Sequence, residues 1–78
     1  MTANREDIEA MGFEYSHRGC ACAGSPSVYQ MERLGECYEL TVYDKRTRPV
    51  WKLTCRKMVL ARGYMEDLQT KLNEIWDL

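Results

Sequence analysis

The 78-residue chain has no run of about 18 consecutive apolar residues, and its amino end lacks a basic segment followed by an apolar stretch. Membrane insertion and export are therefore not predicted, and we expect a cytoplasmic protein. No glycine pattern resembles a phosphate-binding loop. Without an export signal, the four cysteines are expected to be reduced thiols, because cytoplasmic disulfides are rare.

What the chain does contain indicates a folded domain. Its formal net charge is −1, and two tryptophans and five tyrosines argue against a disordered segment. A chain of this length removes only about 60% of its unfolded surface from water, so stability should be modest. We expect residues 1–78 to form one small domain, which folds alone or as a small oligomer.

The strongest pattern is the alternation of apolar and polar residues between Tyr29 and Cys55, which predicts a three-stranded antiparallel meander. A loop centred on Arg46-Thr47 and a turn at Leu34-Gly35 place the predicted core residues on one face, namely Tyr29, Met31, Tyr38, Leu40, Val42, Trp51, Leu53 and Cys55. The predicted core-side pairs are Val42 with Trp51, Leu40 with Leu53, Tyr38 with Cys55, Tyr29 with Leu40 and Met31 with Tyr38. The predicted open-face pairs include Tyr43 with Val50, Thr41 with Lys52 and Glu39 with Thr54.

A fourth strand and two helices complete the expected α+β fold, with the helices packed on one face of an antiparallel sheet. The expected strands are 13–22, 27–33, 36–44 and 49–58, and the expected helices are 4–11 and 64–77. The first helix has Thr2 or Asn4 as its cap and ends at Gly12. A reversal at Gly24-Ser25 would place Cys20 beside Tyr29 and Cys22 beside Ser27 on the core side.

The second helix is predicted from apolar residues at helical spacing, namely Tyr64, Leu68, Leu72, Ile75 and Trp76. Residues 58–63 are ambiguous, because Leu60 and Tyr64 also lie one helical turn apart. Gly63 disfavours a continuous helix and suggests a break.

His17, Cys20 and Cys22 offer the nitrogen and sulfur ligands that zinc prefers. Structural zinc sites, however, usually bring ligands as two pairs that are each separated by two to four residues. The predicted register also places Cys37 on the open face and Cys55 on the core face, so one site cannot include both. We therefore expect no metal and no other cofactor, and a site built on His17, Cys20 and Cys22 remains the alternative.

Redox and nucleophilic chemistry receive less support. In a strand, Cys20 and Cys22 would lie about 7 Å apart, too far for a relaxed disulfide, although in a turn they could approach. His17 would lie on the opposite strand face from Cys20. No grouping supplies a nucleophile, a base and an orienting residue together, so a non-enzymatic protein is expected.

Basic residues are concentrated between Lys45 and Arg62, a segment without any acidic residue. A basic sheet face with an exposed aromatic can bind phosphates and stack a base. The same cations could instead neutralise acidic residues of the neighbouring strand, or protect a sheet edge. The residues expected to contact a partner are Tyr43, Lys45, Arg46, Arg48, Lys52 and Arg56.

The leading hypothesis is a small accessory protein that binds a macromolecule through its open sheet face and the 45–48 tip. The partner would be another protein or a second copy of the chain, and no membrane is expected. The second hypothesis is a nucleic-acid-binding module that uses the basic sheet face. The third is a zinc-stabilised module built on His17, Cys20 and Cys22.

Overall fold

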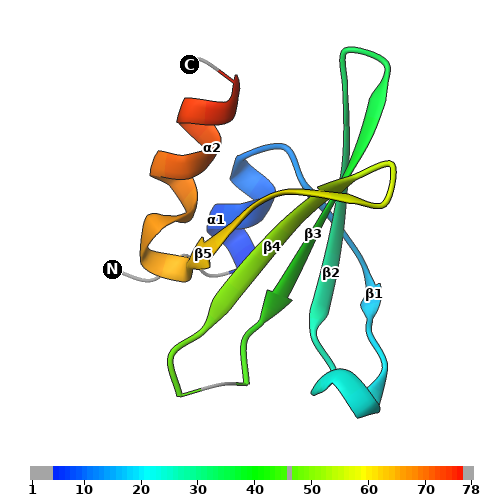
Figure 1. The fold of residues 1–78 in the computed structure, drawn as a ribbon, viewed down its shortest axis with the longest axis vertical. Coiled ribbons are helices and arrows are strands. Elements are labelled where there is room, and N and C mark those ends of the chain that lie inside the picture. Colours follow the sequence, from blue (N-terminus) through cyan, green and yellow to red (C-terminus); the bar gives the residue numbers. More distant parts are fainter. Residues whose placement is uncertain (1–4, 46, 77–78) are drawn as a thin grey trace.

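The computed structural model describes residues 5–45 and 47–76. A five-stranded antiparallel sheet runs in chain order from β1 to β5 (Figure 1). The strands are β1 (Glu14–Arg18), β2 (Ser27–Arg33), β3 (Glu36–Tyr43), β4 (Val50–Cys55) and β5 (Met58–Tyr64). The helices are α1 (Arg5–Ala10) and α2 (Leu68–Trp76), and the 3-10 turns are η1 (Ala21–Ala23) and η2 (Met65–Asp67). The predicted α+β meander is confirmed, with one strand more than expected.

The register of the three central strands is also confirmed. Val42 faces Trp51 and Leu40 faces Leu53 across β3 and β4, while Met31 faces Tyr38 across β2 and β3. A slip of one residue would expose these apolar side chains and bury charged ones, so the pattern permits a single alignment. The β2–β3 turn consists of Leu34 and Gly35, as predicted, and both residues have positive φ.

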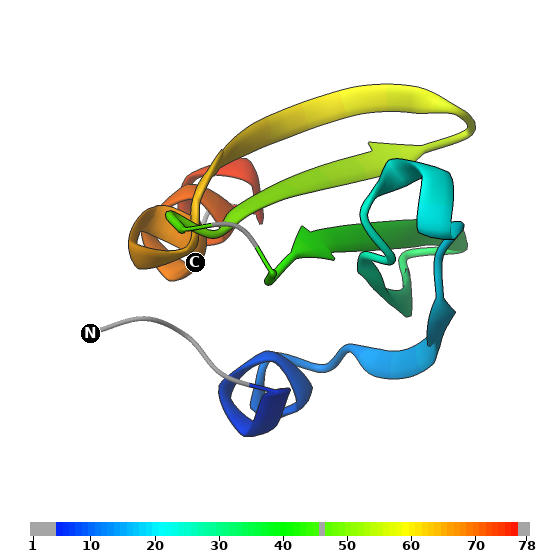
Figure 2. The same ribbon diagram turned by 90° about the horizontal axis from the view of Figure 1, so that it is seen from below.

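Both helices cover the same face of the sheet, which Figure 2 shows from below. Ile8 of α1 and Leu68 and Leu72 of α2 join one buried cluster with sheet residues. The buried sheet residues of this cluster are Tyr29, Leu40, Val42, Trp51 and Leu53. Met31, Tyr38 and Cys55 point to the same side but are only half-buried, and Met31 and Tyr38 pack against this cluster.

The fifth strand corrects the expected ends of both neighbouring elements. The predicted strand 49–58 ends at Cys55, because Arg56 and Lys57 both adopt positive φ and reverse the chain. Strand β5 follows, and its pairing shifts beside Leu53, so that Leu60 is bulged. Tyr64 belongs to this strand, and the predicted helix 64–77 begins only at Leu68, after η2.

The predicted first strand, 13–22, is shorter and paired differently from expectation. Strand β1 ends at Arg18, and a bulge lies between Tyr15 and His17. Tyr15 therefore faces Tyr29, and Arg18 faces Ser27. Cys20 and Cys22 occupy neither position, because the chain from Gly19 onward turns away through η1.

The first helix spans Arg5–Ala10, close to the expected 4–11, and Gly12 with φ of 103° follows it as predicted. The proposed caps Thr2 and Asn4 lie outside the described residues. Within the described part of the chain, no helix has the length and apolarity needed to cross a membrane.

Candidate binding site on the open sheet face

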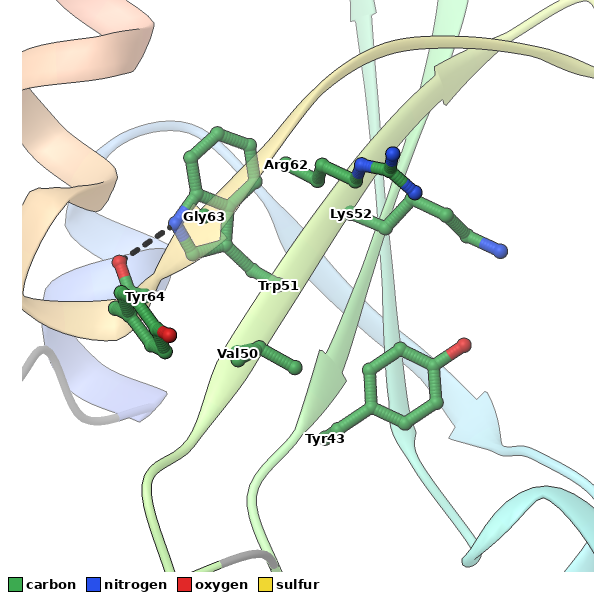
Figure 3. A pocket seen from close by; sticks show the side chains of 7 residues that line it. All are labelled: Tyr43, Val50, Trp51, Lys52, Arg62, Gly63 and Tyr64. Carbon is green, nitrogen blue, oxygen red and sulfur yellow. Dashed lines mark hydrogen bonds between the residues drawn. The ribbon is translucent and has the colours of Figure 1, made fainter.

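Two cations lie side by side on the sheet face opposite the helices. Lys52 of β4 and Arg62 of β5 are direct cross-strand partners, so their side chains share one face. Figure 3 shows both side chains extending in the same direction from neighbouring strands. Neither forms an ion pair with any acidic residue among those that the structure describes.

These cations border a pocket of about 410 Å³ (Figure 3). Its lining residues are Tyr43, Val50, Trp51, Lys52, Arg62, Gly63 and Tyr64, and we call this surface the basic groove. Tyr43, Val50 and Tyr64 pair across three adjacent strands, which places two tyrosines and a valine in one row. The groove therefore combines apolar and aromatic surface with positive charge.

Trp51 connects the groove to the core. Its side chain is only 1% exposed and points away from Lys52 toward the helices. The indole Nε1 donates a hydrogen bond of 2.8 Å to the backbone carbonyl of Tyr64, which holds β5 against β4. Gly63 lies against the indole ring, and a Cβ atom at this position would lie 3.6 Å from the ring.

Arg48 belongs to the rim of the groove, but its charge is already compensated. Its guanidinium lies 3.6 Å from the centroid of the Tyr64 ring and donates a hydrogen bond of 2.5 Å to Glu66. This hydrogen bond, together with the charge of Arg48, lowers the pKa of Glu66. Arg48 therefore packs against the Tyr64 ring, and its positive charge is paired with Glu66 and not free to bind a partner.

The remaining predicted contact residues are divided between the two ends of the sheet. Lys45 is exposed in the β3–β4 connection, whereas Arg46 lies outside the described residues. The β4–β5 turn lies at the other end of β4 (Figure 1). Arg56 belongs to this turn and forms an ion pair with Glu36. Tyr43 and Lys52 are thus brought together as predicted, while Arg56 is not.

Arg62 is the groove residue that sequence reasoning did not place. It was one of the cations between 45 and 62, but a face can be assigned to it only once β5 is known. The sequence carries no strong signal for it, because only Val59 among residues 58–60 is a β-branched strand former and Arg56-Lys57 has no residue typical of a tight turn.

The three residues considered for zinc do not converge. Cys20 and Cys22 form a disulfide, and Nδ1 of His17 lies 2.9 Å from the hydroxyl of Ser16. Across residues 5–45 and 47–76, no group of three or more histidines, cysteines and acidic residues could hold a metal ion. The disulfide also differs from the expected reduced thiols, because η1 brings the two cysteines closer than a strand would.

Comparisons with protein-family models, with curated proteins and with solved structures each found no match for this chain.

Proposed function

We propose that this chain is a small, non-enzymatic accessory protein that binds an anionic macromolecule in the basic groove. The observation that carries the proposal is the juxtaposition of Lys52 and Arg62 without acidic partners among the described residues. Like charges directly opposite each other on adjacent strands destabilise a sheet. An arrangement that costs stability is best explained by a partner that neutralises it.

A protein is the leading partner, because the groove continues into an apolar sheet edge. Strand β5 is an edge strand, and three successive side chains on it are exposed. Met58 is 67% exposed, Val59 is 52% exposed and Leu60 is 45% exposed. Unpaired backbone groups beside apolar side chains suit the addition of an extended protein segment. Acidic residues in that segment would face Lys52 and Arg62, and the binding would take place in the cytoplasm expected from the sequence.

Nucleic acid is the second candidate, and the two groove tyrosines favour it. Tyr43 and Tyr64 flank Val50 on the same face as Lys52 and Arg62. Single-stranded nucleic acids bind surfaces that combine cations for phosphates with aromatic rings for bases. Stacking on Tyr64 is limited to one ring face, since Arg48 covers the other.

The test is site-specific photo-crosslinking in the native cell. A photo-reactive phenylalanine replaces Tyr43 in the groove or, as the control, Lys71, an exposed residue of α2. We expect a discrete crosslinked species from position 43 only, and its loss in the Lys52→Glu/Arg62→Glu variant. A crosslink that survives this double reversal would refute the groove as the contact surface.

The two partner classes are separated in vitro. Labelled single- and double-stranded oligonucleotides are titrated with the purified chain at several salt concentrations, with Lys71→Glu as the charge-matched control. Nucleic-acid binding requires an affinity that falls steeply with salt and with Lys52→Glu, but not with Lys71→Glu. Absence of binding at low salt leaves the protein partner, whose crosslink is resistant to nuclease.

A further inference from the structure

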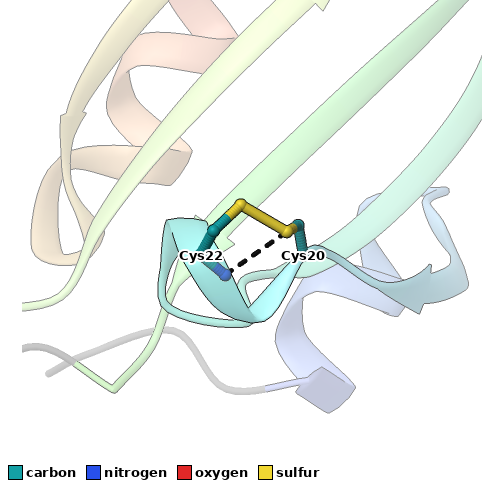
Figure 4. Close-up of a disulfide and its surroundings, with 2 residues drawn as sticks. All are labelled: Cys20 and Cys22. Carbon is teal, nitrogen blue, oxygen red and sulfur yellow. Dashed lines mark hydrogen bonds between the residues drawn. A yellow bond between two sulfur atoms is a disulfide. The ribbon is translucent and has the colours of Figure 1, made fainter.

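The η1 turn contains a surface disulfide that the proposed binding function does not use. Cys20 precedes the turn and Cys22 lies within it, with 5.3 Å between their Cα atoms (Figure 4). Both cysteines are exposed. The disulfide therefore lies where a thiol in solution, or one on another protein, can reach it.

This disulfide contributes little that the turn does not already have. Gly19 donates a backbone hydrogen bond to Pro26, and Ser25 donates one to the carbonyl of Cys20. The guanidinium of Arg18 adds a hydrogen bond of 2.7 Å to the carbonyl of Ser25. A disulfide between residues two positions apart closes a very short loop and removes little entropy from the unfolded chain. Stabilisation of the fold is therefore a poor explanation for it.

The two sulfur atoms are not equivalent. The backbone N–H of Cys22 donates a hydrogen bond to Sγ of Cys20 over 3.3 Å (Figure 4). A donor of this kind stabilises negative charge on the sulfur that accepts it. Cys20 is therefore the better leaving group, and Cys22 is the sulfur that an incoming thiolate should attack.

We propose that Cys20 and Cys22 form a thiol–disulfide exchange site that oxidises dithiols. A thiolate of the dithiol forms a bond to Sγ of Cys22, the Cys20–Cys22 bond breaks, and its electron pair goes to Sγ of Cys20, which then takes up a proton. The second thiol of the donor then loses its proton and attacks the donor sulfur that is bonded to Cys22. The bond between that sulfur and Sγ of Cys22 breaks, and Cys22 takes up a proton and leaves as a thiol. In sum, the donor becomes a disulfide and the chain gains two thiols.

The proposed exchange does not require the other two cysteines. Cys37 and Cys55 lie in β3 and β4, within the sheet, and neither forms a disulfide. Cys55 faces Tyr38 on the core side, whereas Cys37 lies on the open face. In the cytoplasm expected for this chain, disulfides are usually transient and catalytic or redox-sensing, which fits exchange better than a permanent crosslink.

The first experiment uses the full chain with Cys37→Ser and Cys55→Ser, so that only the disulfide cysteines remain. Thiols are counted with a chromogenic disulfide reagent after purification without reductant and after equilibration with dithiothreitol of known redox state. We expect no thiols before reduction and two afterwards, with one oxidised dithiothreitol formed per chain. Far-UV circular dichroism should stay unchanged.

Three results would overturn the proposal. Two free thiols before any reduction would show that the disulfide does not form, and stoichiometric zinc in that protein would support the metal site instead. Loss of the circular dichroism signal on reduction would show a structural crosslink. Failure of dithiothreitol to reduce the folded chain would show that the disulfide is not accessible.

The order of attack is tested with two single-cysteine variants in the same background. Cys22→Ser leaves Cys20 with its backbone N–H donor, and Cys20→Ser leaves Cys22 without that bond. We expect iodoacetamide to alkylate Cys20 severalfold faster than Cys22 at neutral pH, with the rates converging at high pH as both thiols ionise. Faster alkylation of Cys22 at neutral pH would reverse the assigned leaving group.

Discussion

The indole of Trp51 donates a hydrogen bond to the backbone carbonyl of Tyr64, across the strand pair that borders the basic groove. The bond joins the buried aromatic residue of β4 to the last residue of β5. Because α2 follows Tyr64 after only three residues of η2, the same bond also positions the closing helix. The core and the proposed binding surface therefore share one residue.

Trp51→Phe should lower the free energy of unfolding by about 2 kcal/mol, because it leaves a cavity and an unpaired carbonyl. Trp76→Phe is the matched control, because the indole N–H of Trp76 has no hydrogen-bond partner among the described residues. Urea unfolding followed by circular dichroism measures both variants. Equal losses would contradict a special contribution from the Trp51 hydrogen bond.

The β4–β5 turn offers a stabilising change. Arg56 and Lys57 have φ of 53° and 66°, a conformation that costs roughly 1 kcal/mol or more for each residue other than glycine or asparagine. Replacing them with Asn-Gly should raise the free energy of unfolding by about 1 kcal/mol. The lost Arg56–Glu36 pair is exposed and offsets little of this gain.

The control for the turn is Arg56→Ala, which removes the ion pair but keeps a side chain that disfavours positive φ. Urea denaturation should show this variant to be no more stable than the parent. If Asn-Gly also failed to stabilise the chain, β5 would not be joined to β4 by a tight turn.

The same turn explains why β5 was not predictable from the sequence. Tight hairpins are recognised by glycine, asparagine or aspartate at the reversal, and Arg56-Lys57 has none of them. The bulge at Leu60 then disrupts the alternation, and three successive exposed apolar residues resemble neither a half-buried strand nor an amphipathic helix.

The central register was predictable because burial on one face leaves a single alignment of β2, β3 and β4. Tyr43 and Lys52 of the groove followed from it, whereas Arg62 and Tyr64 depended on the missing strand. The cysteines were misplaced because β1 is a short edge strand with mixed faces and a bulge. Residues 19–22 contain no alternation of apolar and polar side chains that would have indicated the end of β1 at Arg18.

Cys37 and Cys55 should differ in reactivity, because they lie on opposite faces of the sheet. Cys37 is exposed, whereas burial and the neighbouring Glu36 raise the pKa of Cys55. At neutral pH, the thiolate fraction of Cys55 is therefore smaller than that of an ordinary cysteine. In a Cys20→Ser/Cys22→Ser background, mass spectrometry should find Cys37 alkylated severalfold faster by iodoacetamide, with the difference narrowing as pH rises. Equal rates at neutral pH would contradict the register.

Acid should weaken the rim of the groove through Glu66. Its pKa is lowered in the folded chain by the hydrogen bond and charge of Arg48. Its contribution to stability is therefore present above the ordinary carboxyl value of about 4.3 and is lost as pH falls through the lower folded value. Carboxyl NMR titration should show the Glu66 pKa rising toward the ordinary value in Arg48→Gln. An unchanged titration would contradict the pair.

Stability and binding should respond oppositely to charge reversal in the groove. Lys52→Glu places a carboxylate directly across from Arg62, which converts a repulsive cross-strand pair into an attractive one. The free energy of unfolding should rise by about 0.5 kcal/mol at low salt, and the gain should shrink as salt screens the charges. Urea denaturation at two salt concentrations measures this effect.

The double variant Lys52→Glu/Arg62→Glu separates the two effects. It restores like charges, so its stability should return to that of the parent, while the crosslink formed from position 43 should be lost completely. Each single reversal should weaken that crosslink even though it stabilises the fold. We expect stability to rise while crosslinking falls, because the introduced carboxylate and an anionic partner would compete for the same cation. If Lys52→Glu instead lowered stability, the two cations would already be neutralised within the chain, and the pair would not indicate an anionic partner.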